Sequence, residues 1–241
     1  MRSKTGSRTE RPGQSPRFVR EVSGSELAVL KSIAEEATAP GGDRQQTAVQ
    51  LEGFLDQLLQ WTQDSNLVAQ NDLGRLASRH VSESLAVLPL LDRLAPRRLV
   101  DVGSGAGFPG IPIQIARPDW SVTLVESRRR KGLFLQRIVL GLQLEHAKVL
   151  VARAEHLEGL FDERFDVATA RAVALIGEIL PWLAPLVRVG GHAVLFKGSS
   201  HPEELAGWQK TKDPTWAYRE TVPVPDRHLA FVVFERLADP S

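Results

Sequence analysis

The stretch RLVDVGSGAGFPGIP, residues 98–112, decides the fold class. A short apolar run includes an acidic residue, Asp101, and glycine then occupies positions 103, 105, 107 and 110. Glycine loses more backbone entropy on folding than any other residue, so four glycines in so short a stretch need a reason. The pattern is typical of a sharp turn from a strand into a helix, where the backbone approaches a ligand closely.

The segments around this turn predict an alternation of strands and helices. Strand-like apolar runs occupy residues 98–102, 121–126, 147–152, 165–170, 192–197, 216–222 and 228–235. Helical segments lie between them at 110–118, 129–142 and 174–187. Such alternation is typical of a mostly parallel sheet covered by helices on both faces. We therefore predict an α/β fold with a Rossmann-like sheet of seven strands.

Three amphipathic segments precede the sheet. They cover residues 25–37, with Ser25 as the expected N-cap, then 47–61, and then 72–94, a helix expected to kink before Pro89. The apolar face of the second helix is expected to carry Val49, Leu51, Phe54, Leu55, Leu58 and Leu59. We expect three regions: a disordered basic arm over 1–22, a helical extension over 23–95, and a catalytic domain over 96–237.

Composition narrows the function classes. Residues 1–20 carry six Arg or Lys against one acidic residue, Glu10, so the arm is either simply disordered or a loose contact to phosphates. The net charge of +1 across 241 residues gives no global attraction to nucleic acid. Because the chain has no cysteine, it has no disulfide, thiolate metal site or cysteine nucleophile. We expect no metal, no secretory signal, no membrane span and a cytoplasmic location.

The glycine turn admits two kinds of nucleotide ligand. The sequence GAGFPG matches the dinucleotide pattern, and Glu126 follows at a distance suited to ribose hydroxyls. Asp101, however, would meet a diphosphate unfavourably and a cationic ligand favourably. The pattern D-x-G-x-G-x-G followed by an acidic strand end favours S-adenosylmethionine. Asp101, Gly103, Gly105, Gly107 and Glu126 are the expected cofactor-binding residues from this motif, and a NAD-dependent oxidoreductase is the rival.

Neighbouring motifs carry a closer resemblance. SRH at 78–80 with SES at 82–84, VESRRRKGLFLQ, ARAEHL, ATARAVA, LFKG and DRHLAFVV occur in this order around the turn. Over roughly residues 50–236 the chain resembles the GidB/RsmG family of 16S ribosomal RNA guanine-N7 methyltransferases. The resemblance implies a class I S-adenosylmethionine-dependent methyltransferase fold with an N-terminal helical extension. It also implies 16S ribosomal RNA, in the small ribosomal subunit or its assembly intermediate, as the substrate.

The resemblance also implies roles for individual residues. Gly103, Phe108, Ala154, Glu155 and Arg171 are expected to line the cofactor pocket, and Arg171, Lys197 and Arg227 to surround the reacting centre. One departure from the family pattern R-H-x-x-D-S is visible, because Glu83 stands in the aspartate position. Another is NLV at 66–68, where the family has N-L-T.

Several of these residues also have purely structural interpretations. Asp101 could be a satisfied turn carboxylate, Glu126 a helix cap, and His80 the partner of a local hydrogen bond. The basic run RRRK at 128–131 is either a solvated helix face or a contact to ribosomal RNA.

The expected chemistry needs no general base. Attack through a pyrimidine carbon requires a cysteine, and methylation of an exocyclic amine commonly uses an Asn/Asp-Pro-Pro-aromatic turn where this chain has ATARAVA. Guanine N7 offers a free lone pair, so the protein has only to align it and exclude water. We expect a monomer. A catalytically silent ribosome-binding module is the third alternative.

Overall fold

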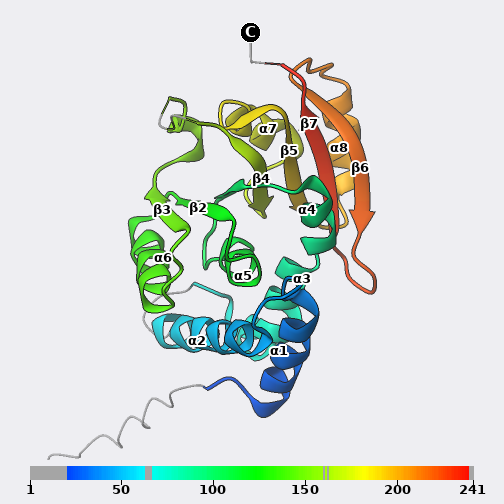
Figure 1. Ribbon diagram of the computed structural model, residues 1–241. Helices are drawn as coiled ribbons and strands as arrows, with labels where there is room; N and C mark the ends of the chain where they lie inside the picture. Colours follow the sequence, from blue (N-terminus) through cyan, green and yellow to red (C-terminus); the bar gives the residue numbers. More distant parts are fainter. Residues whose placement is uncertain (1–20, 63–66, 160, 162, 239–241) are drawn as a thin grey trace, which may run out of the picture.

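The structure is a computed structural model that describes residues 21–62, 67–159, 161 and 163–238 (Figure 1). Residues 1–20 of the predicted arm and Asn66 lie outside this described part. Seven strands form one sheet in the order β3-β2-β1-β4-β5-β7-β6, which confirms the α/β prediction. The strands are β1 (Arg98–Val102), β2 (Ser121–Glu126), β3 (Ala147–Val151), β4 (Phe165–Arg171), β5 (Val187–Lys197), β6 (Trp216–Pro223) and β7 (Ala230–Arg236).

Strand pairing places a ligand edge at the centre of the sheet. β1 pairs in parallel with both β2 and β4, and β5 continues the parallel set beside β4. β7 is antiparallel to β5 and to β6. Chain order reverses between β1 and β4, and ligands of such sheets bind beyond the carboxyl ends of the strands at this point. The register also sets Asp101 of β1 beside Thr169 of β4.

Two hydrophobic clusters cover the two faces of the sheet. One contains Leu99 and Val167 with apolar side chains of α1, α2, α5 and α6, and the other contains Val100 and Ala168 with side chains of α7 and α8. Neighbouring residues of one strand therefore enter opposite clusters, as the two-residue period of a strand requires. The helices are α1 (Gly24–Ala37), α2 (Arg44–Thr62), α5 (Gly110–Ala116), α6 (Arg129–Gly141), α7 (Ile176–Leu183) and α8 (His201–Gln209).

The segment predicted as one kinked helix over 72–94 is broken into four elements. They are the 3-10 helix η1 (Gln70–Arg75), the π-helix η2 (Leu76–Val81), α3 (Ser82–Leu85) and α4 (Leu88–Leu94). Pro89 lies in the first turn of α4, because proline cannot continue α3 without losing a hydrogen bond and meeting the carbonyl of Leu85. The Glu26 carboxylate accepts the amides of Ala77 and Ser78 at 2.7 and 3.1 Å, which stabilises the first turn of η2.

Two local predictions for the helices were wrong, and one helix was missed. The N-cap of α1 is Ser23, whose hydroxyl accepts the Glu26 amide at 3.3 Å, so Ser25 lies inside the helix. Val49 of α2 is 61% exposed, whereas its five predicted partners on the apolar face are buried. Helix α8 was not predicted, because Trp208 is its one buried residue and a single buried position leaves little periodicity in the sequence.

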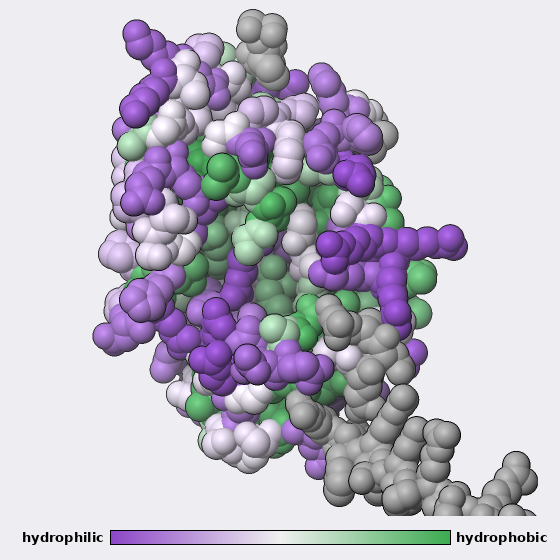
Figure 2. All heavy atoms as spheres, turned by 180° about the vertical axis from the view of Figure 1, so that it is seen from behind, coloured by the Kyte–Doolittle hydropathy of each residue, from purple (hydrophilic) through white to green (hydrophobic). Residues whose placement is uncertain are grey.

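The helices of the N-terminal part gather at one end of the molecule, beside the sheet (Figure 1). Helix α2 packs against both α5 and α6, while α1 packs against α2, η2 and α3. The face in Figure 2 is hollowed at mid-height, with hydrophobic residues in its depth and hydrophilic residues gathered around it. The broken helical segment η1–η2–α3 is thus held between α1 and the edge of the sheet.

Candidate active site

The turn between β1 and α5 folds as the glycine pattern predicts. Gly103, Gly105 and Gly107 have φ values of +74°, +57° and +97°, a region that side-chain-bearing residues rarely adopt. The amides of Gly103 and Ser104 both donate to the carbonyl of Val125, at 2.9 and 3.0 Å, which fastens the turn to the end of β2. The turn therefore lies at the carboxyl edge of the sheet, at the switch point between β1 and β4.

The three glycines differ in what a side chain would meet. A Cβ atom on Gly103 would lie 2.5 Å from Cγ2 of Val173, and one on Gly107 would lie 2.9 Å from Cγ1 of Ile111. A Cβ atom on Gly105 would meet nothing closer than a backbone oxygen at 3.7 Å and the Lys131 Nζ at 3.9 Å. Gly103 and Gly107 are thus required by internal packing, and Gly105 faces the space that a ligand can enter.

Asp101 supports the turn from behind. Its side chain is fully buried, with Oδ1 accepting from the Thr169 hydroxyl at 2.9 Å and Oδ2 accepting the Gly110 amide at 3.2 Å. Burial raises the pKa of this carboxyl to about 6, although hydrogen bonds from Ser104, Thr169 and Gly110 act in the opposite direction. Asp101 therefore shapes the turn and the start of α5, and it presents no surface of its own.

Glu126 ends β2 and connects the turn to α6. Its Oε2 accepts the Gly105 amide at 3.0 Å, and its Oε1 accepts the Arg128 amide at 2.7 Å. The alternative of a helix cap thus describes part of what Glu126 does. Oε1 also accepts the Ser127 hydroxyl at 3.4 Å, whereas Oε2 has a second lone pair that can accept a ribose hydroxyl. The residue combines a structural role with the donor–acceptor chemistry expected of a nucleoside site.

Phe108 joins the turn to the helical segment. Its ring is 7% exposed and packs edge-on against Phe54, with centroids 5.2 Å apart. The His80 ring stacks on it at 5.2 Å and an interplanar angle of 29°. Burial, followed by the charge of Arg171, lowers the pKa of His80, so its imidazole is neutral at pH 7. His80 thereby brings η2 into contact with the glycine turn.

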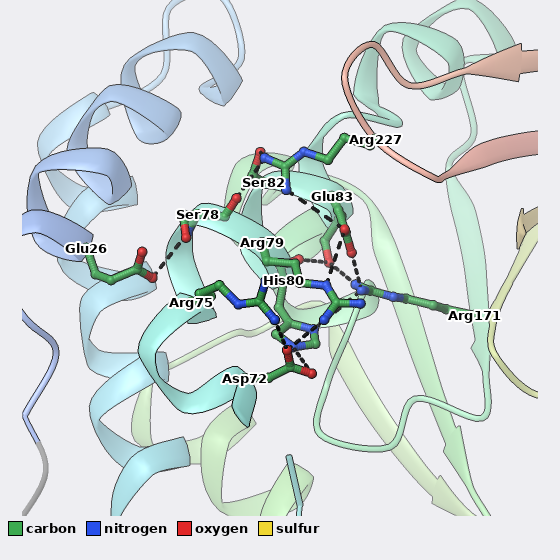
Figure 3. A network of polar contacts seen from close by, with 11 residues as sticks. Glu26, Asp72, Arg75, Ser78, Arg79, His80, Ser82, Glu83, Arg171 and Arg227 are labelled. Carbon is green, nitrogen blue, oxygen red and sulfur yellow. Dashed lines mark hydrogen bonds and ion pairs between the residues drawn. The ribbon is translucent and has the colours of Figure 1, made fainter. Parts of the chain in front are cut away.

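The predicted cationic residues lie in two separate groups. Arg171, at the end of β4, pairs with the Glu83 carboxylate, and its Nη2 lies 3.4 Å from Nδ1 of His80 (Figure 3). Arg227 donates to the Ser78 carbonyl at 2.7 Å, and its Nη1 lies 3.9 Å from Oε1 of Glu83. The structure therefore brings Arg171 and Arg227 together on one carboxylate.

Lys197 forms the other group. Its Nζ donates to the Ala174 carbonyl at 2.6 Å and pairs with Glu204 of α8 at 2.7 Å. Burial acts to raise the pKa of Glu204, but the hydrogen bonds from Lys197 and Ser200 outweigh it, and the pKa lies below its usual range. Lys197 therefore fastens the loop after β4 to α8.

The residues that follow β3 and β2 lie at the same carboxyl edge of the sheet as the glycine turn. Ala154 and Glu155 belong to the 3-10 helix η3 (Ala154–His156); Ala154 is half-buried and Glu155 is exposed. Arg128, Arg129 and Arg130 are exposed at the start of α6, whose Lys131 approaches Gly105. The basic run therefore begins directly beside the glycine turn.

Several polar residues of the site had no predicted role. Asp72 accepts Arg75 at 3.0 Å and Arg79 at 2.6 Å, and Arg79 also lies 3.6 Å from Glu83. The SRH and SES motifs pointed to this segment. They did not show which partners it meets, because those partners lie on β4 and on the loop between β6 and β7.

One cavity of the molecule lies away from the carboxyl edge of the sheet. A cavity of about 580 Å³ lies between the α1–α2 connection, the end of α5 and the segment before β3, at the amino ends of the strands. Within the described residues, no group of three or more His, Asp or Glu is placed to hold a metal ion. In the same part of the chain, none of the helices is both long and apolar enough to cross a membrane.

Solved structures with a similar fold are methyltransferases. The O-methyltransferase TomG of Streptomyces achromogenes, in complex with SAM, superposes with a TM-score of 0.54 at 14% identity, covering 77% of this chain and 90% of that one. A putative O-methyltransferase of Klebsiella pneumoniae superposes with a TM-score of 0.53 at 13% identity, covering 89% and 99%. At these identities the comparison establishes the class I methyltransferase fold.

Sequence relatives identify the family. The family model GidB, described as rRNA small subunit methyltransferase G, matches residues 47–228. The Ribosomal RNA small subunit methyltransferase G of Sorangium cellulosum (strain So ce56) is 43% identical over 155 residues, which cover 64% of this chain and 65% of that protein. That of Laribacter hongkongensis (strain HLHK9) is 39% identical over 153 residues, covering 64% and 72%. The matches thus span about two thirds of these relatives, and the chain belongs to the GidB family.

Proposed function

We propose that this protein transfers a methyl group from S-adenosylmethionine to N7 of a guanine in 16S ribosomal RNA. The observation that carries the proposal is the meeting of two features at one edge of the sheet. The open backbone at Gly105 lies beside Glu126, and the His80 ring connects the same turn to Arg171. In a chain of the GidB family, these contacts support a nucleoside site that adjoins a cationic site for the base.

The residues of the edge fit S-adenosylmethionine. Gly105 leaves room for close approach, and the second lone pair of the Glu126 Oε2 can accept a ribose hydroxyl. Ala154 and Glu155 border the position proposed for the adenine. Asp101, Gly103, Gly107 and Phe108 are proposed to act by holding the shape of the turn, since they are buried or packed against neighbours. The cofactor supplies an electrophilic methyl group on a sulfonium.

The protein's share of the chemistry is orientation. When the N7–methyl bond forms as the methyl–sulfur bond breaks, the positive charge passes from sulfur to the guanine, and no proton has to leave. Arg171 is proposed to donate to guanine O6, which leaves the N7 lone pair free, and Arg227 to contact a phosphate. Lys197 is proposed to hold the loop after β4 so that Arg171 keeps its direction. Excluding water and fixing the approach geometry supply the rate enhancement.

We further propose how the chain is organised and where it acts. Residues 23–95 form the helical extension, 96–237 the methyltransferase domain, and 1–22 a basic arm. One hydrophobic cluster includes side chains of α1 and α2 as well as of the sheet, which supports an extension that folds onto the domain. A cytoplasmic monomer acting on the small subunit or its assembly intermediate is the expected form.

The test is to map labelled methyl groups on small subunits purified from cells that lack this protein. We expect one labelled guanine, and we expect a substrate with 7-deazaguanine at that position to bind but to accept no methyl group. Methyl transfer to the deaza substrate would place the acceptor atom elsewhere and overturn the mechanism.

Two further experiments identify the substrate form and the cofactor. Assaying free 16S RNA, an assembly intermediate and the mature subunit in parallel identifies the form that accepts the methyl group. Calorimetric titration with S-adenosylhomocysteine and with NAD separates the methyltransferase from the oxidoreductase, because only the former requires selective binding of S-adenosylhomocysteine.

A further inference from the structure

Glu83 is the point at which three separate segments meet. Its carboxylate pairs with Arg171 at the end of β4, and it lies 3.6 Å from Nε of Arg79 on η2 and 3.9 Å from Nη1 of Arg227 on the β6–β7 loop (Figure 3). The residue itself is 9% exposed. One buried negative charge therefore compensates guanidinium groups that the chain brings together from three distant places.

The charges around Glu83 do not balance. Asp72 holds Arg75 and Arg79, and the charge of the buried Asp101 also acts on Arg171, so three carboxylates face four arginines. The side chain of Arg171 is 15% exposed, whereas that of Arg227 is 30% exposed. A guanidinium as buried as that of Arg171 is stable in place only while a partner compensates it, since an unpaired buried charge is strongly destabilising.

We propose that Glu83 is a positioning residue for methyl transfer: its carboxylate aims Arg171 and Arg227 into the reacting edge and at the same time limits how strongly the cluster holds RNA. This inference rests on the proposed function. Without the Glu83 charge, Arg171 turns toward solvent, and the cluster gains one positive charge for phosphates. Positioning and affinity then change in opposite directions, a combination that a merely structural residue does not produce.

The decisive variant is Glu83→Gln, which preserves size and one acceptor oxygen but removes the charge. We expect the single-turnover rate of methyl transfer at saturating RNA and cofactor to fall at least tenfold. We expect the affinity for the substrate RNA at low salt to rise about threefold, with a steeper salt dependence, because one more cation is available to phosphates. Glu83→Asp restores the charge with a shorter reach, so the salt dependence should return to the wild-type slope and part of the rate should be recovered.

Glu163→Gln is the matched control. Glu163 pairs with Arg98 at the amino end of β1, so this variant makes the same chemical change away from the reacting edge. Its single-turnover rate should equal that of the wild type. Melting curves of all variants establish that each is folded at the assay temperature.

The outcomes separate this inference from the proposed function. If the wild type transfers no methyl group to N7, both fall. If the wild type is active and Glu83→Gln shows the wild-type rate and salt slope, the positioning role is wrong and the proposed function stands. A parallel loss of rate and RNA affinity with an unchanged slope would also overturn the role. If Glu83→Gln fails to fold, Glu83→Asp decides: a wild-type salt slope with a lowered rate supports positioning, and an unchanged rate contradicts it.

Discussion

Two pairs of carboxylates lie at the same edge of the sheet and have opposite kinds of partner. Asp101 and Glu126 accept backbone amides of the glycine turn and of the helices that follow, groups without net charge. Asp72 and Glu83 accept guanidinium groups. The same functional group therefore shapes the backbone on one side of the edge and holds cations on the other.

This difference in partners shifts the pKa values of Asp101 and Asp72 in opposite directions. Burial raises the pKa of Asp101 to about 6, because amides and hydroxyls offset only part of the loss of water. Burial also acts to raise the pKa of Asp72, but the Arg79 charge and hydrogen bond outweigh it, and the pKa lies below its usual value. The buried acid of the glycine turn is thus only partly compensated, whereas the guanidinium groups around Asp72 more than offset its burial.

The largest effect should come from the turn itself. Gly105→Val should weaken S-adenosylhomocysteine binding on the order of a thousandfold, about 4 kcal/mol, because the branched side chain fills the open space and opposes a φ of +57°. Thermal shift with and without ligand measures this, since a ligand specific for the native state raises its melting temperature. Gly41→Val is the control, as Gly41 has a φ of +80° and open space outside the site. Equal ligand shifts in both variants would contradict the proposed cofactor position.

The second effect concerns the buried acid of the turn. The pKa of Asp101 is about 6 in the folded state against 3.8 as the reference, so its contribution to stability is complete below about pH 4 and is lost as pH rises through about 6. At pH 7 the charged form costs about 3 kcal/mol, estimated at about 1.4 kcal/mol for each pKa unit. Asp101→Asn should therefore gain stability over the wild type as pH rises from about 4 to about 7, as measured by urea unfolding.

Asp166 is a carboxylate whose pKa is shifted in the opposite direction from that of Asp101. It accepts the Arg97 and Arg98 amides and pairs with Arg188. Burial acts to raise the pKa of Asp166, but these partners outweigh burial, and the pKa lies below its usual value. Its contribution to stability is present above the reference pKa and is lost as pH falls through the lowered value. Asp166→Asn should thus lose stability at neutral pH. If Asp101→Asn and Asp166→Asn both gained stability at neutral pH, the different partners of the two carboxylates would not explain their different contributions to stability.

A smaller effect is expected from the basic run. Replacing Arg128, Arg129 and Arg130 with Gln should weaken RNA binding on the order of tenfold at about 0.1 M salt and flatten its salt dependence, because fewer counterions are released. The double variant of Arg188 and Arg219 to Gln removes charge from outside the ligand edge and should keep most of the slope. A triple variant with the wild-type salt slope would return the run to the interpretation of a solvated helix face.

The smallest effect is expected from pH on the chemical step. With N7 as acceptor, no side chain has to remove a proton, so the single-turnover rate should be nearly constant from about pH 7 to 8.5. The pKa of His80 is lowered by burial and by Arg171, so its ring does not change charge in this range. Only protonation of Asp101 should alter the rate, near pH 6. A rate that rises between about pH 7 and 8.5 would indicate a general base and would contradict this mechanism.

The glycine turn and the arginine cluster around Glu83 also differ in how far the sequence predicts them. The turn from Asp101 to Gly110 is a local structure, so its residues and their order were sufficient to predict the strand, the turn and the following helix. The Glu83 cluster depends on residues 88 positions apart, and on a break at η1 and η2 that an amphipathic pattern does not show. Motifs singled out Arg171, Arg227 and Glu83 but did not show that the two arginines share this carboxylate, because the packing of η2 on α1 and of α3 on α5 brings them together.

The two hydrogen bonds from the Ala77 and Ser78 amides to Glu26 have a consequence for how much of the chain is needed to hold the site in place. Helix α1 lies before residue 47, where the family match begins, yet it braces the segment that carries His80 and Glu83. A version shortened to the matched residues would leave the buried amide of Ala77 and the part-buried amide of Ser78 without their acceptor, next to the cationic cluster. We therefore expect the minimal stable unit to begin at α1, ahead of the residues that the family model matches.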